Sequence, residues 1–231
     1  MQTIGLLGGM SWESTQSYYA AINQGIKQYL GGLHSAKLVL YSVDFAEIEA
    51  LQQRGDWAAA AQILGQAAQS LQAAGADFLV IATNTMHKVA PEIQQQISIP
   101  LLHIADATAR VLQQHGVQKV GLLGTAFTME QAFYRERLEA QGIGVVVPDA
   151  PERAEVHRVI YQELCLGTVS DASRSRYLQI IDALAERGAQ AVILGCTEIG
   201  LLVRQTDTSV PLYDTTAIHA AATVSRALAG Q

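Results

Sequence analysis

The stretches IGLLGGM at residues 4–10 and VGLLGTA at residues 120–126 are near copies of each other, and they decide the fold. Two more matching pairs follow in the same order: ADFLVIATNTMH at 76–87 with AQAVILGCTEIG at 189–200, and IPLLHIADA at 99–107 with VPLYDTTAI at 210–218. The first two blocks begin 72 residues apart in the first half, from 4 to 76, and 69 apart in the second, from 120 to 189. Three matches in one order at similar spacing indicate an internal duplication.

Each block opens on a short, fully apolar run, which is typical of a strand buried on both faces of a parallel sheet. The segments between the blocks have apolar residues at three- and four-residue spacing, as in residues 55–75, where Asp56 can cap a helix and Gly75 can end it. Two other helices are expected, over residues 11–32 with Ser11 or Ser14 as cap, and over residues 175–188. This alternation predicts an α/β fold of two pseudo-symmetric domains, each a parallel sheet flanked by helices.

The composition argues against nucleic acids and anionic membranes as binding partners. The chain of 231 residues is 49% hydrophobic and 16% charged, with a net charge of -6 and scattered Lys and Arg, which is typical of a globular protein without a basic surface for nucleic acid or anionic membranes. The N-terminus does not resemble a secretory signal, and the apolar runs are too short to cross a bilayer, so we expect a cytoplasmic protein. Its two cysteines, Cys165 and Cys196, are expected to be thiols.

Candidate site residues follow the apolar runs, because ligands of open parallel sheets bind beyond the carboxyl ends of the strands. These candidates are Gly8, Gly9, Met10, Ser11, Thr83, Asn84, Thr85, Gly124, Thr125, Cys196, Thr197 and Glu198. The repeat aligns Thr83 with Cys196. If the duplicated halves face each other, these two side chains lie on opposite walls of one cleft.

The loop GLLGGMS at residues 5–11 has neither the G-x-G-x-x-G order of a dinucleotide fold nor the G-K-[ST] ending of a P-loop, which argues against nucleotide binding. Two interpretations stay open. The loop either offers backbone N–H groups to a carboxylate at a helix N-terminus, or it is a tight turn that needs glycine backbones.

Cys196 lies one residue beyond the apolar run and its glycine, so we interpret it as a functional thiol, with a pKa lowered by a nearby helix start. Glu198 either pairs with a neighbouring donor or tunes this thiol. Cys165 falls among helical apolar positions and is expected in the core. The histidines have no H-x-x-x-H or H-E-x-x-H spacing, so no metal is expected. His87 is interpreted as a structural histidine, with the positioning of Asn84 or of substrate as the alternative.

The segments GGMSWEST, YYAAIN, NTMH, GT-x-x-T at 124–128 and GCTE together resemble the aspartate/glutamate racemases, over essentially the whole chain. The resemblance implies an active site in the inter-domain cleft, a C-terminal helix that returns to the first domain, and a homodimer. The domains would be residues 1–103 with 213–231, and residues 104–212. It also implies racemisation of aspartate or glutamate without pyridoxal phosphate or any other cofactor, by one cysteine that removes the α-proton and a second that protonates the opposite face.

Carried onto this sequence, the resemblance gives the two catalytic positions to Cys196 and Thr83. It assigns substrate binding to Met10, Ser11, Gln52, Asn84, Thr85, Thr125, Thr128, Thr197 and Glu198. The sequence departs from the family at Thr83, because a threonine hydroxyl is several pK units less acidic than a thiol. Three alternatives therefore stay open: a racemase with an unequal pair, a single-thiol decarboxylase or isomerase of the same superfamily, and an amino-acid-binding protein with impaired catalysis.

Overall fold

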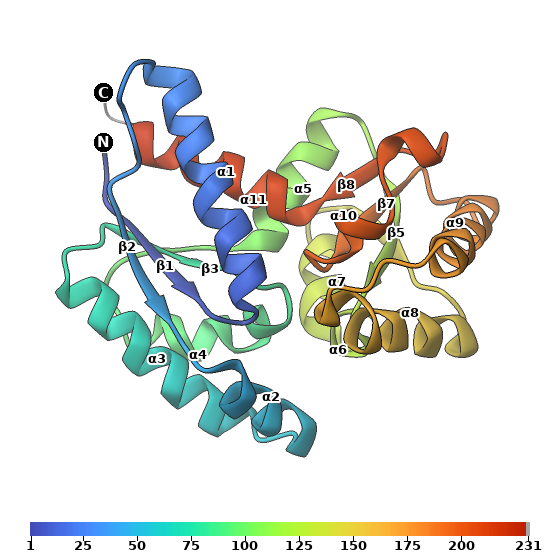
Figure 1. Cartoon of the computed structure of the whole chain (residues 1–231), viewed down its shortest axis with the longest axis horizontal. Coiled ribbons are helices and arrows are strands. Elements are labelled where there is room, and N and C mark those ends of the chain that lie inside the picture. The colour runs from blue at the N-terminus through green and yellow to red at the C-terminus, as the bar shows by residue number, and fades with distance from the viewer. Residues whose placement is uncertain (230–231) are drawn as a thin grey trace. The chain divides into compact units, whose positions relative to one another are not determined.

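The chain divides into two compact units in a computed structural model that describes residues 1–229 (Figure 1). The first unit comprises Met1–Ile104 and the chain from His219 onward, and the second comprises Ala105–Ile218. The expected second domain, 104–212, begins one residue earlier and ends six residues earlier than this unit. These six residues are the rest of the strand Leu212–Asp214, which pairs within the sheet of the second unit, and the first four residues of the helix that starts at Thr215.

The first unit alternates strands with helices, as the repeat predicts. Its elements are β1 (Ile4–Gly8), α1 (Trp12–Leu30), β2 (Leu38–Ser42), α2 (Phe45–Arg54), α3 (Trp57–Ala73), β3 (Phe78–Ile81), the 3-10 helix η1 (Thr85–Val89), α4 (Ala90–Gln94) and β4 (Leu101–Leu102).

The second unit repeats this alternation. Its elements are β5 (Lys119–Gly124), α6 (Ala126–Glu130), α7 (Ala132–Glu139), β6 (Gly144–Val146), α8 (Ala150–Gln162), η2 (Leu164–Leu166), α9 (Asp171–Glu186), β7 (Ala191–Gly195), α10 (Ile199–Leu202), η3 (Gln205–Asp207) and β8 (Leu212–Asp214). The chain crosses between the units at the start of α5 (Ile104–Gln114) and within α11 (Thr215–Leu228). None of the helices in residues 1–229 is long and apolar enough to cross a membrane.

The two sheets have the same topology. Their strand orders are β2-β1-β3-β4 and β6-β5-β7-β8, and every pairing is parallel. The predicted α/β class with two pseudo-symmetric parallel sheets is therefore confirmed, and each half places its first and second repeat blocks on neighbouring central strands.

Strand residues of the first sheet point alternately into two apolar clusters. Leu7, Leu79 and Ile81 pack with α2, α3 and η1, whereas Leu6 and Val80 pack with α1 and α11 on the other face. Figure 1 shows α3 and α1 on opposite sides of this sheet. Because the sheet is buried on both faces, the sequences of its strands are unbroken apolar runs.

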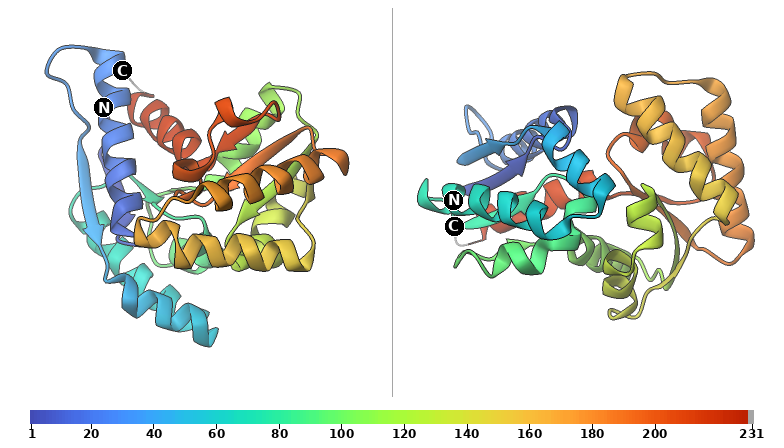
Figure 2. Two further views of the ribbon diagram at one scale, coloured as in Figure 1. Left: turned by 45° about the vertical axis from the view of Figure 1, so that its right-hand side comes forward. Right: turned by 90° about the horizontal axis from the view of Figure 1, so that it is seen from below.

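One face of the second sheet is covered by α8 and α9, which lie side by side in both views of Figure 2. Val159 of α8 and Ile180 of α9 pack there with Leu123, Val192 and Leu194 of the central strands. The core of this unit is therefore built on the two strands that carry the repeat blocks.

The predicted caps of two helices agree with the structure, whereas the helix expected from residue 175 begins earlier, at Asp171, where the Ser170 side chain caps it by accepting a hydrogen bond from the Ser173 N–H. Ser11 caps α1 by accepting a hydrogen bond from the Ser14 N–H at 3.3 Å, and Asp56 caps α3 by accepting one from the Ala59 N–H at 3.1 Å. Gly75 follows the end of α3 with a φ of 91°, a conformation that side chains disfavour.

Close backbone approach requires glycine at the end of β7. A Cβ atom on Gly195 would lie 2.7 Å from the Leu123 carbonyl oxygen and 3.2 Å from a Leu122 methyl. Gly195→Ala is expected to lower the free energy of unfolding by about 1–3 kcal/mol, because extra volume in a packed site displaces its neighbours. Urea denaturation measures this difference.

The matched control is Gly144→Ala at the start of edge strand β6, where the nearest atoms to a Cβ are 3.7 Å away. It should change stability by less than about 0.5 kcal/mol. Equal losses in the two variants would contradict the packing argument.

Candidate functional site

In the first unit, β1 and β3 end next to each other. Leu7 is in register with Ile81, and the Ala82 N–H donates to the Leu7 carbonyl at 2.9 Å. The hydroxyl of Ser14, in the first turn of α1, donates to the Ala82 carbonyl at 3.2 Å. The start of α1, which follows the loop after β1, is thus bonded to Ala82, the residue that precedes Thr83.

The glycine loop after β1 uses its polar groups internally. The Gly9 N–H donates to the Thr15 hydroxyl at 2.8 Å, and the Ser11 hydroxyl is the cap of α1. Gly9 has a φ of 92°, and a Cβ there would clash with the backbone of Val43. These contacts favour the tight-turn interpretation of the loop, with Met10 itself 4% exposed in the core.

Gln52 presents a buried amide on α2. Its side chain is 3% exposed, and Nε2 donates to the Met86 sulfur at 2.9 Å. Its Oε1 has no hydrogen-bond partner within residues 1–229. A buried acceptor left in this state is energetically unfavourable, so it is available to a donor that enters the site.

Thr83 lies on a turn that leads into η1. It is half-buried, whereas Asn84 and Thr85 after it are buried. The turn is closed by the His87 N–H, which donates to the Asn84 carbonyl at 3.1 Å, and by the His87 ring, whose Nδ1 lies 2.7 Å from the Thr83 carbonyl. His87 is 1% exposed and is bonded to the backbone, in agreement with the structural role expected from sequence.

In the second unit, β5 and β7 end on glycines in register, Gly124 and Gly195, so Thr125 and Cys196 begin neighbouring loops. The Thr125 hydroxyl caps α6 by accepting from the Thr128 N–H at 3.3 Å, and the two threonine hydroxyls are also 3.3 Å apart. Thr128 is fully buried. The edge of the second sheet therefore gathers Thr125, Thr128 and Cys196, three of the residues singled out from sequence.

Cys196 bonds to an acid rather than to a cation. Its thiol donates to Oε2 of Glu198 at 2.9 Å, and Glu198 is 9% exposed. Although part of the residue remains exposed, burial of the sulfur raises the pKa of the Cys196 thiol well above its usual range, and the charge of Glu198 raises this pKa further. The lowered pKa expected from the sequence is therefore wrong: α10 has only 4 residues, and the adjacent carboxylate disfavours a thiolate.

Two contacts at this edge were missed at the sequence level. The Thr216 hydroxyl donates to the Thr197 hydroxyl at 3.3 Å, and the His157 Nδ1 accepts from the Ala126 N–H at 3.1 Å, next to Thr125. The sequence carried a signal for Thr216, because it comes shortly after the apolar start of the third repeat block, as Cys196 does in the second. Nothing in the spacing of His157 pointed to the loop after β5.

The structure also describes the surroundings of both cysteines. Neither cysteine is in a disulfide. Cys165 lies on the 3-10 turn η2 and is only half-buried against the core of the second unit, so its placement inside a core helix is wrong. Among residues 1–229, no three His, Cys, Asp or Glu side chains are grouped as a metal ion would require.

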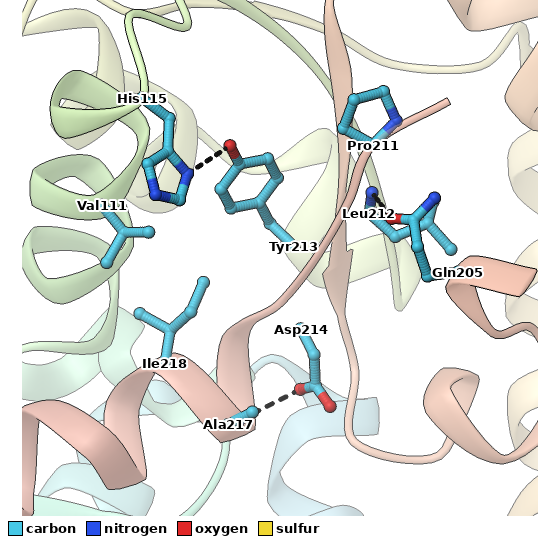
Figure 3. A pocket seen from close by; sticks show the side chains of 9 residues that line it. All are labelled: Val111, His115, Gln205, Pro211, Leu212, Tyr213, Asp214, Ala217 and Ile218. Atoms are coloured by element: carbon cyan, nitrogen blue, oxygen red, sulfur yellow. Dashed lines mark hydrogen bonds between the residues drawn. The ribbon is translucent and has the colours of Figure 1, made fainter. Parts of the chain in front are cut away.

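A cavity of about 480 Å³ in the second unit lies beside β8 and contains none of the predicted site residues (Figure 3). His115 and Tyr213 line it and are hydrogen-bonded to each other at 2.8 Å. Asp214 lines it as well, with Oδ1 accepting from the Thr216 and Ala217 N–H groups. The polar groups of this cavity are thus engaged in holding β8 and the start of α11.

The Cys196–Glu198 contact has a measurable consequence. In a Cys165→Ser background, which leaves one thiol, we expect slow alkylation of Cys196 by iodoacetamide at pH 8, because the thiolate is the reactive form. Glu198→Gln should speed this alkylation and move its pH profile to lower pH, since a negative charge beside the sulfur is removed. The rate of alkylation followed by mass spectrometry against pH tests this.

Glu186→Gln is the matched control, because Glu186 is an exposed carboxylate at the end of α9. Its profile should be that of the parent. An unchanged or upward-shifted profile in Glu198→Gln would contradict the assigned cause of the raised pKa.

Known proteins are similar to most of this chain. The profile of the Asp/Glu/hydantoin racemase family matches residues 7–223. The broad specificity amino-acid racemase RacX of Bacillus subtilis is 28% identical over 171 residues, which are 71% of this chain and 70% of that protein.

Two solved structures are also similar to the chain. A candidate Asp/Glu racemase from Yersinia pestis is 58% identical, with a TM-score of 0.94 over 99% of this chain and 100% of that one. An aspartate racemase homologue from Pyrococcus horikoshii is 36% identical, with a TM-score of 0.87 over 98% and 99% of the two chains.

Proposed function

The chain belongs to the Asp/Glu/hydantoin racemase family and is an amino-acid racemase, an isomerase; we propose that its substrates are aspartate and glutamate and that it needs no pyridoxal phosphate. Cys196 is the principal acid and base, and Thr83 serves the opposite face of the substrate. The observation that carries the proposal is the Cys196 thiol at the carboxyl end of β7, bonded at 2.9 Å to the carboxylate of Glu198.

Glu198 is a proton acceptor for the Cys196 thiol. In the direction that begins at Cys196, the S–H proton moves to Oε2 of Glu198, and the thiolate then takes the α-proton of the amino acid. The electron pair of the broken C–H bond moves into the substrate carboxylate as an enediolate. A thiol of raised pKa gives a thiolate of raised basicity, which suits a weak carbon acid.

In the opposite direction Cys196 is the acid. The S–H form, which burial and Glu198 favour, then delivers its proton to the α-carbon, and Glu198 returns a proton to the sulfur. This direction starts with Glu198 protonated, which is the state in which the first direction leaves it. The pair gains one proton when Cys196 takes the α-proton and loses one when Cys196 delivers it. Water on the Thr83 side supplies or removes the matching proton at the opposite face of the substrate, and exchange with water resets both sides before the next turnover.

The enediolate requires donors that are already oriented, because its charge develops on the substrate carboxylate. The hydroxyls of Thr85, Thr125 and Thr197 and the amide of Asn84 are the donors that we assign to the substrate carboxylates, and Thr128 supports Thr125. Gln52 Oε1, buried and without a partner in residues 1–229, fits the substrate ammonium group. Met10 and Ser11 complete the wall beside Gln52.

Thr83 makes the pair unequal, because its hydroxyl is a far weaker acid than a thiol and needs a water molecule to pass on a proton. The two enantiomers have the same free energy, so kcat/KM must be equal in the two directions. An unequal pair therefore shows itself only as different kcat and KM values for the two enantiomers.

Exchange of the α-proton in D2O tests the proposal. We expect L- and D-aspartate or glutamate to lose their α-proton NMR signal while optical rotation decays. Cys196→Ser should lower the rate by at least about 10²-fold, the usual contribution of an acid or base. Cys165→Ser, the other cysteine, should keep the parental rate.

Other outcomes separate the alternatives. Exchange with rotation preserved would mean that Cys196 works alone on one face. Loss of carbon dioxide from an arylmalonate without amino-acid exchange would favour a single-thiol decarboxylase. Tight binding of acidic amino acids without any exchange would favour an impaired binding protein, and full turnover in Cys196→Ser would rule out Cys196 as the principal acid and base.

Thr83→Cys should restore two thiols. We expect kcat/KM to rise by the same factor for both enantiomers, since a second thiol can exchange protons directly. Thr83→Ser is the control, because it keeps a hydroxyl and should stay within a few-fold of the parent. Progress curves from each enantiomer give both constants, and a Thr83→Cys variant slower in both directions would count against Thr83 as the partner of Cys196.

Two properties remain proposals from sequence alone. We propose that the protein acts in the cytoplasm and assembles as a homodimer. Sedimentation equilibrium measures the second property directly.

A further inference from the structure

The Thr83 carbonyl lies just beyond the end of the β3 ladder. Ala82 is the last residue to bond to β1, through its N–H, and the chain then turns into η1. This carbonyl is part-buried, so it needs a hydrogen-bond donor. His87, four residues on, supplies it from its side chain at 2.7 Å.

The other ring nitrogen of His87 fixes its protonation. Nε2 lies 3.2 Å from the backbone nitrogen of Ile104, which can only donate. The Thr83 carbonyl can only accept. Nε2 must therefore be unprotonated and Nδ1 must carry the hydrogen, so His87 is neutral and held as a single tautomer between two backbone groups.

The ring packs against two other histidine rings of the first unit. His103 lies 4.6 Å from it and His219 5.7 Å, between ring centroids. His219 bonds to the Tyr18 hydroxyl and to the Leu102 carbonyl, both at 2.9 Å, and burial lowers its pKa to about 4. The segment Leu102–Ile104 is thus bonded to a histidine at each end.

We infer that His87 is a positioning residue for the reaction: it holds the Thr83 peptide, and with it the Thr83 hydroxyl, at a fixed place relative to the start of α5. The inference rests on the proposed function. It extends that function to a residue that touches no reacting atom and acts only through the Thr83 carbonyl.

Fixing this peptide matters because proton transfer depends on the placement of the hydroxyl. A displacement of about 1 Å of a catalytic group can reduce a rate by about 10²-fold. Thr83 has a short side chain with one hydroxyl, so a shift of its peptide moves that oxygen directly.

Two conservative variants separate the bonds that the ring makes. An asparagine nitrogen can occupy the place of Nδ1, so His87→Asn keeps the donor to the Thr83 carbonyl and loses the acceptor for Ile104. A glutamine oxygen can occupy the place of Nε2, so His87→Gln keeps the acceptor and loses the donor. We expect His87→Gln to lower kcat by about 10- to 100-fold with KM within a few-fold, and His87→Asn to stay within about 5-fold of the parent.

Stability is controlled with Ile93→Val, a core truncation in α4 at a fully buried position. It should lower the Tm while kcat is kept. Equal losses in His87→Asn and His87→Gln, or losses that follow the Tm as in Ile93→Val, would overturn the positioning role.

The tautomer is measured independently of turnover. Long-range ¹H–¹⁵N NMR of the wild-type protein at pH 7 should show a protonated Nδ1 and an unprotonated Nε2 for His87, and the reverse pattern would overturn the inference even if neither variant folds. A wild-type protein without α-proton exchange would end the racemase proposal. The role of His87 in positioning the turn would still be tested by its tautomer. It would also be tested by the amide resonances of Asn84 and Thr85, which His87→Gln should shift and His87→Asn should not.

Discussion

The close approach of β5 and β7 at their carboxyl ends is the constraint on which the second half of the site depends. Gly124 and Gly195 are in register. A Cβ on Gly195 would lie 2.7 Å from the Leu123 carbonyl oxygen, which is too close, and one on Gly124 would lie 3.1 Å from the Gly195 carbonyl oxygen. With glycine at both positions the strands stay paired to their last residue. Thr125 and Cys196 then begin adjacent loops, so the pairing of β5 with β7 sets the distance between them.

The bond between Cys196 and Glu198 decides what kind of group this thiol is. A thiol beside a cation would be ionised and would act as a ready nucleophile. Beside a carboxylate and buried, it keeps its proton and has an acceptor 2.9 Å away. Such a pair is suited to moving protons, which is the chemistry of the family to which the chain belongs.

The duplicated scaffold carries different groups at equivalent places. Both sheets have the same strand order, and the second repeat block aligns Thr83 with Cys196. The same alignment makes Thr85 equivalent to Glu198 and His87 equivalent to Gly200. The second unit thus has a thiol with its own carboxylate, whereas the first has a hydroxyl on a turn fastened by a histidine ring, so two copies of one fold have become chemically distinct.

The sequence by itself determined the fold and the edges on which the candidate residues lie. Apolar runs repeated in order define parallel strands, and polar residues after Gly8, Ala82, Gly124 and Gly195 must follow strand ends, because these are properties of local order along the chain. Helix caps such as Ser11 and Asp56 were predictable for the same reason.

Only the tertiary structure decided the properties that depend on what lies next to a side chain in space. The pKa of Cys196 is raised instead of lowered because burial and the orientation of Glu198 outweigh a helix start of a single turn. The contact of Thr216 with Thr197 joins residues 19 positions apart, and the bond of His87 to Ile104 joins residues 17 apart. Strand order and loop conformation bring these residues into contact, and the periodicity of the sequence does not predict such contacts.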